Sequence, residues 1–126
     1  MPWVSLNAFK ALVAEALDDL PPYVQERLEN VAVLVEEWPG PERLAELGHD
    51  PDETLLGLYE GINRLERGGS YHLAVPDRIT LFWGPLVEEV GPGNREALRR
   101  EVRKTVIHEV AHHFGFADEE LERLEA

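Results

Sequence analysis

The sequence of 126 residues predicts an α+β domain, in which a small sheet of about three strands is covered by helices. Two observations lead to this prediction. Segments near both ends of the chain repeat apolar residues with a helical period, and three short segments between them have the composition of strands. The chain is 44% hydrophobic and 29% charged, which is typical of a globular protein. At this length we expect residues 1–126 to form a single domain.

The first helix is expected to begin at Ser5 or Asn7, because either side chain can cap a helix N-terminus. Pro21 and Pro22 end this helix and open a short second one over residues 23–29. The apolar positions of the first helix follow the period of 3.6 residues, and they are Phe9, Leu12, Val13, Ala16 and Leu17.

Three segments between the helices are predicted to be strands. The first, VAVLVEEW at 31–38, is short and β-branched, and one helical turn is expected after it at 41–47. The second is Leu55–Glu60, where Gly57 weighs against a stable helix. The third is Arg78–Trp83, RITLFW, in which apolar and polar residues alternate.

A long helix is predicted after the GPG turn at 91–93, with Asn94 as its cap and Gly115 as its end. A short acidic helix is expected to follow at 119–126. The long helix has an apolar residue at every fourth position, and these are Leu98, Val102, Val106, Val110 and Phe114.

Composition and charge exclude several classes of function. The absence of cysteine excludes disulfides and thiolate metal ligands, so a metal must be held by imidazole and carboxylate groups. A net charge of −13 repels phosphate backbones and anionic lipids, so we expect neither a nucleic-acid nor a membrane partner. No apolar run approaches the roughly 18 residues of a membrane helix. The N-terminus lacks the pattern of a signal peptide, and we therefore expect a cytoplasmic protein.

The stretch HEVAHHFGFAD at 108–118 carries the chemistry. His108 and His112 are one helical turn apart, so both imidazoles can reach one metal ion. They flank Ala111 at the border of the apolar stripe, where a cleft can open. Glu109 projects near the metal and can accept a proton from metal-bound water, whose pKa the ion lowers to about 7. This H-E-x-x-H pattern on a helix predicts zinc-dependent hydrolysis.

A catalytic zinc site needs a third protein ligand, and Asp118 is our prediction for it. Gly115 lets the chain leave the helix, and the next residues can then fold back towards the histidine pair. Asp118 also has the sequence context of a helix N-cap, which is the alternative role for it. The site is expected to hold one Zn²⁺ per chain, although two histidines and a carboxylate suit other divalent ions as well. The rival third ligands are Glu119, Glu120 and Glu122.

The pattern His108-Glu109-x-x-His112-x-x-Gly115-x-x-Asp118 resembles that of metzincin-type proteases, with aspartate in the place of the third histidine. Together with LLGLYEG and PDRITLFWGPL, it is similar to a family of short bacterial zincin-like metallopeptidases with a minimal fold. The resemblance covers about the C-terminal two-thirds of the chain. It implies that His108, His112 and Asp118 bind zinc, that Glu109 is the catalytic acid and base, and that peptide bonds are cleaved. The methionine turn of metzincins is absent, since Met1 is the only methionine.

In zincins an edge strand before the active helix commonly binds extended substrate. The resemblance therefore implies a peptide or protein partner, held by strand addition at Arg78–Trp83. A second hypothesis is a zinc-stabilised module that binds peptides or proteins with little or no turnover. A third is an RNA-processing metal hydrolase, which the acidic charge and Glu109 disfavour.

The remaining candidates are predicted to have lesser roles. His113 falls in the apolar arc and is expected to be a core or supporting histidine. His49 and His72 are expected at the surface. Tyr71 is a candidate for oxyanion stabilisation, in the manner of tyrosines in other zincins.

Overall fold

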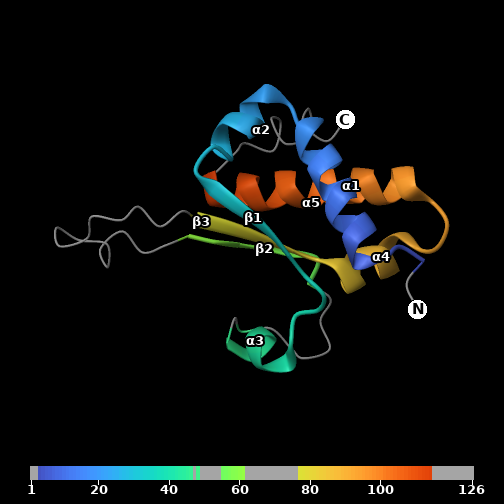
Figure 1. Ribbon diagram of the computed structural model, residues 1–126. Coiled ribbons are helices and arrows are strands. Elements are labelled where there is room, and N and C mark those ends of the chain that lie inside the picture. The colour runs from blue at the N-terminus through green and yellow to red at the C-terminus, as the bar shows by residue number, and fades with distance from the viewer. Residues whose placement is uncertain (1–2, 47, 49–54, 62–76, 115–126) are drawn as a thin grey trace.

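The computed structural model describes residues 3–46, 48, 55–61 and 77–114, with only the backbone at residues 113 and 114. It is an α+β structure, as the sequence predicted, with a three-stranded sheet and helices packed on it (Figure 1). In chain order the described elements are α1 (Leu6–Asp18), α2 (Pro22–Arg27), β1 (Val31–Glu36), α3 (Pro41–Glu46), β2 (Gly57–Glu60), β3 (Asp77–Phe82), α4 (Trp83–Val90) and α5 (Arg95–Phe114).

The order of the strands is β1-β3-β2, so β3 is the central strand. It pairs in parallel with β1 and antiparallel with β2, and Ile79 is opposite Val33 on one side and Tyr59 on the other. The expectation that Arg78–Trp83 forms an edge strand is therefore wrong, because both edges of β3 are already paired. Its last residue, Trp83, belongs to α4. Among the described strands, the open edges belong to β1 and β2.

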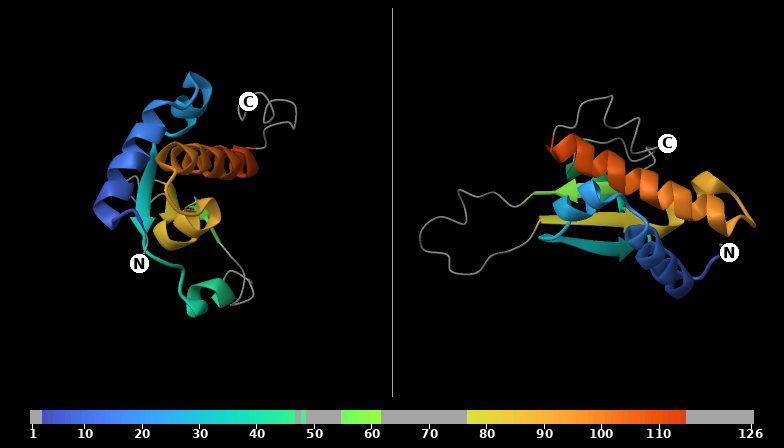
Figure 2. Two further views of the ribbon diagram at one scale, coloured as in Figure 1. Left: turned by 90° about the vertical axis from the view of Figure 1, so that its right-hand side faces the viewer. Right: turned by 90° about the horizontal axis from the view of Figure 1, so that it is seen from above.

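The helices α1, α2 and α5 lie over one face of the sheet, and α3 lies apart on the other side (Figures 1 and 2). The core fills the space between these helices and the sheet, where the β3 side chains Ile79 and Leu81 are fully buried. The apolar stripe predicted for α5 is confirmed over its described side chains, because four of them have no exposed area, namely Leu98, Val102, Val106 and Val110.

The predicted caps are confirmed at two helices, and of the two candidates for the first helix Ser5 is the cap. The Ser5 hydroxyl accepts a hydrogen bond from the Ala8 N–H at 3.1 Å and caps α1. The Asn94 side-chain oxygen accepts one from the Ala97 N–H at 2.9 Å, at the start of α5. Such side-chain oxygens satisfy main-chain donors that the first helical turn leaves without partners.

The helix α4 was not predicted, because the Gly84-Pro85 pair that follows the predicted strand is typical of a turn. Pro85 lies in the first turn of α4, where a missing N–H costs no helical hydrogen bond. Gly84 packs directly under the Trp38 ring, and a Cβ atom there would lie 2.1 Å from Trp38 Cε2. Any larger residue at position 84 would therefore clash with the Trp38 ring.

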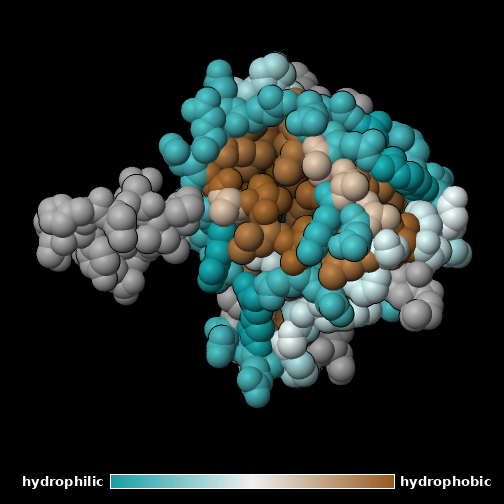
Figure 3. Space-filling model, in the orientation of Figure 1, coloured by the Kyte–Doolittle hydropathy of each residue, from teal (hydrophilic) through white to brown (hydrophobic). Residues whose placement is uncertain are grey.

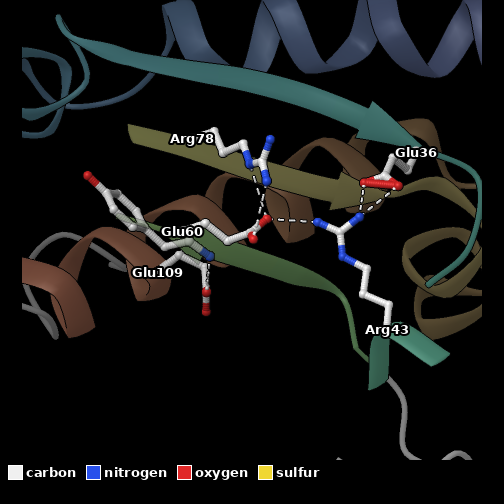
Figure 4. A network of polar contacts seen from close by, with 6 residues as sticks. Glu36, Arg43, Glu60, Arg78 and Glu109 are labelled. Atoms are coloured by element: carbon white, nitrogen blue, oxygen red, sulfur yellow. Dashed lines mark hydrogen bonds and ion pairs between the residues drawn. The ribbon is translucent and has the colours of Figure 1, made fainter. Parts of the chain in front are cut away.

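A network of charged side chains ties α3 to the strands (Figure 4). Arg43 from α3 lies 2.6 Å from a carboxylate oxygen of Glu36 in β1 and 2.7 Å from one of Glu60 in β2. Arg78 in β3 reaches the same Glu60 oxygen at 3.2 Å. Because Glu60 ends β2, the network fixes this short strand to its neighbours.

The two open edges of the sheet border different surfaces. Beside β1, apolar side chains gather on the surface next to α1 (Figure 3), where a groove of about 570 Å³ runs between Val13 and Leu17 of α1 and Val33 and Val35 of β1. Beside β2, a cleft lined by both apolar and charged side chains carries the histidine pair of α5. Of the described helices, none is both long enough and apolar enough to cross a membrane.

Candidate active site

A cleft of about 390 Å³ lies between β2 and α5. His108 and Glu109 are half-buried in it, whereas His112 is exposed and Ala111 beside it is buried. His108 and His112 thus lie at the border of the buried face of α5, as their positions in the sequence predicted. The residues that line the cleft are Leu55, Leu56, Gly57, Glu89, Glu101, Lys104, Thr105, His108, Glu109 and His112.

The two histidine rings lie close enough for small side-chain rotations to bring both onto one metal ion. Their ring centroids are 6.2 Å apart and the rings are tilted by 59°. Two imidazoles bound to one zinc at about 2.1 Å, with a tetrahedral angle between them, have centroids roughly 5 Å apart. The difference of about 1 Å is closed by small side-chain rotations, which an exposed residue such as His112 can make. The donor set also suits zinc, since neutral imidazole is one of its preferred ligands.

Asp118, the predicted third ligand, lies outside the part of the chain that the structure describes. Within that part, no group of three histidine, aspartate or glutamate side chains is close enough to hold an ion. Asp118 and its rivals belong to residues 115–126, so its assignment stays a prediction. The same holds for the roles considered for His49, Tyr71, His72 and the His113 side chain.

The carboxylate of Glu109 is held by the backbone of β2. Its Oε1 atom accepts a hydrogen bond of 2.9 Å from the Tyr59 N–H, across 50 residues of sequence (Figure 4). No residue pattern could have indicated this contact, because every residue except proline has a main-chain N–H. The candidate general base is thus fixed against the open edge of the sheet.

Gly57 allows α5 to approach β2 closely. A Cβ atom on Gly57 would lie 2.7 Å from Thr105 Cγ2, closer than carbon atoms in contact can be. Thr105 is buried, and its hydroxyl donates to the Glu101 carbonyl at 2.8 Å, so its side chain cannot easily turn away. Glu109 lies one helical turn beyond Thr105. The glycine therefore sets the distance between Glu109 and the strand.

Replacing Gly57 by alanine is expected to lower the free energy of unfolding by about 1–3 kcal/mol, because the added methyl group overpacks the contact with Thr105. Urea denaturation measures this change. In the Thr105→Ser background, which removes Cγ2 but keeps the hydroxyl, we expect the same substitution to cost much less. An equal cost in both backgrounds would show that Thr105 is not the residue that Gly57 accommodates.

The fold and the site define a small α+β domain with an H-E-x-x-H helix lying against the open edge of its sheet. Residues 28–126 match the family model of zincin-like metallopeptidases, and the chain belongs to this family. Its fold is thus of the zinc-metallopeptidase type.

Among solved structures, a conserved hypothetical protein from Thermus thermophilus is similar. It is 25% identical in sequence, the match covers 88% of this chain and 94% of that one, and the TM-score is 0.52. No curated protein matches the chain.

Proposed function

We propose that this chain is a zinc-dependent metallopeptidase, in which His108, His112 and Asp118 hold the ion and Glu109 is the general base and acid. The observation that carries the proposal is that Glu109 and both histidines line one cleft beside the open edge of β2. Zinc bound at this position would polarise a scissile carbonyl and make a water molecule more acidic.

The residues of the chain then have distinct tasks. Glu109, next to His108 and anchored at Tyr59, accepts a proton from the attacking water and returns it to the leaving amine. The two histidines line the cleft and would bind the ion through their ring nitrogens. The half-buried position of Glu109 excludes part of the surrounding water, and this strengthens its electrostatic interactions.

The substrate edge in this proposal is β2, in place of Arg78–Trp83. Phe82 N–H donates to the Leu56 carbonyl at 3.0 Å, so Leu56 faces β3. In an antiparallel pair, residues facing the partner strand alternate with residues facing away. Gly57 and Tyr59 therefore direct their main-chain groups to the open edge, on the side of the cleft, where the Tyr59 N–H is already bonded to Glu109. An extended peptide can add there as a further strand, with its main chain held by hydrogen bonds.

The charge of the chain supports a peptide rather than a nucleic-acid substrate. An acidic protein of net charge −13 repels nucleic acid, whereas strand addition needs only a peptide main chain. The proposal retains the cytoplasmic location expected from the sequence.

The first test is the zinc content of untagged protein purified without added metal, measured by elemental mass spectrometry. We expect about one zinc per chain, lost in His112→Ala and in Asp118→Ala and retained in the control Glu119→Ala. Retention of zinc in Asp118→Ala would move the third ligand elsewhere. A protein that takes up no metal after reconstitution at neutral pH would contradict the proposal.

The second test is hydrolysis of an unfolded protein mixture, with new peptide termini detected by mass spectrometry. We expect cleavage that a chelator stops and added zinc restores. Zinc binding without any cleavage would instead identify a zinc-stabilised module that binds peptides.

A further inference from the structure

The open edge of β2 offers few main-chain donors, and one of them is already used. Of the β2 residues that face away from β3, Tyr59 donates its N–H to Glu109 Oε1 at 2.9 Å. An edge amide otherwise faces solvent or an added strand. A side chain from a helix occupies it here.

The contact follows from a match between the spacing of the strand and that of the helix. Two residues of a strand advance by about 6.6 Å and four residues of a helix, slightly more than one turn, by about 6 Å. Gly57 of β2 lies against Thr105 of α5. Tyr59 is two residues further along β2 and Glu109 is about one turn further along α5, so these two residues form the next contact between the strand and the helix. Close packing at Gly57 is what brings the carboxylate within reach of the amide.

We infer that the main-chain amide of Tyr59 is a positioning group for the Glu109 carboxylate. The inference rests on the proposed function of Glu109. A glutamate side chain has several rotatable bonds, and a general base works only within hydrogen-bond reach of the proton that it takes. A bond to Oε1 removes much of this freedom and leaves Oε2 to act in the cleft. An added substrate strand then uses the main-chain groups of Gly57 rather than the Tyr59 N–H.

Hydrogen exchange tests the contact without relying on activity. In the zinc-loaded full chain, we expect the Tyr59 amide to exchange slowly in the wild type and at least about tenfold faster in Glu109→Ala. The Leu58 amide, which faces β3, is the internal control and should be unchanged. Equal exchange of the Tyr59 amide in both proteins would overturn the inference.

Kinetics separate positioning of the base from binding of substrate. Tyr59→Pro removes the N–H from an outward-facing edge position, where no ladder hydrogen bond is lost. We expect its kcat to fall by about 10- to 100-fold, because a base misplaced by about 1 Å works that much less well, while KM changes less than about threefold. A raised KM with unchanged kcat would overturn the inference, since the amide would then be binding substrate.

Tyr59→Ala is the matched control for the proline variant. It removes the phenol, which donates to Asp77 at 2.9 Å, but keeps the amide. We expect some loss of stability and a much smaller fall in kcat than in Tyr59→Pro, because the amide still holds Glu109. If Tyr59→Ala loses kcat as strongly as Tyr59→Pro, the inference is overturned. If the wild type cleaves nothing, the proposed function fails, and hydrogen exchange still decides whether the amide holds the carboxylate.

Discussion

Replacing Glu109 by glutamine is expected to lower kcat/KM for peptide hydrolysis by about 10²- to 10⁴-fold, the usual contribution of a general acid–base group. Glutamine has nearly the shape of glutamate, and its side-chain oxygen can still accept the hydrogen bond from Tyr59. It cannot take a proton from water at neutral pH. The variant therefore removes the proton transfer while it keeps the geometry, and we expect its zinc content and unfolding midpoint to stay close to those of the wild type.

Glu101→Gln is the matched control for this substitution. Glu101 is on the same helix and lines the same cleft, so the change removes the same charge at a similar place. Its side chain is two turns from Glu109, and we expect kcat/KM within about threefold of the wild type. If both variants lose activity equally, the cause is the charge of the cleft rather than proton transfer. A Glu109→Gln protein that holds zinc and keeps the full rate would remove Glu109 from the mechanism.

The sequence predicted those parts of the fold that depend on local patterns. The apolar stripe from Leu98 to Val110 and the caps at Ser5 and Asn94 depend on residues within a turn or two, and the structure confirms them. The place of β3 in the sheet was mispredicted, because its pairing with β1 joins segments about 46 residues apart. Alternation along a strand indicates its two faces, and it does not identify the neighbouring strands.

The candidate site also has one part that could be predicted from local sequence and one part that could not. The spacing of His108, Glu109 and His112 within one turn of helix predicted a shared site, and the structure shows that the three residues line one cleft. The contributions of Gly57 and Tyr59 were missed. Gly57 contributes the absence of a side chain, which leaves room for Thr105, and Tyr59 contributes a main-chain amide. Neither leaves a residue-type signal until β2 and α5 are brought together.

A large loss of stability is expected when Phe9 in α1 is replaced by alanine. The family match begins at residue 28, so α1 lies entirely outside it. Even so, Phe9 and Leu12 have no exposed area and belong to the same core cluster as the stripe of α5. Ion pairs from Glu15 to Arg95 and from Asp19 to Arg99 also join the N-terminal segment to α5. The helix that carries the site is therefore supported by a helix outside the matched region.

We expect Phe9→Ala to lower the free energy of unfolding by about 3–5 kcal/mol, the usual cost of removing a buried aromatic side chain. Urea denaturation measures this, and Tyr23→Ala, which truncates an aromatic residue that is 41% exposed, should cost less than about 1 kcal/mol. Well below the unfolding midpoint, zinc binding by Phe9→Ala should match the wild type, because Phe9 does not line the cleft. An unfolding free energy unchanged by Phe9→Ala would mean that α1 is not part of the cooperative core. Among the described elements, the stability of α5, and with it the placing of Glu109 against β2, would then have to come from the sheet, α2 and α4.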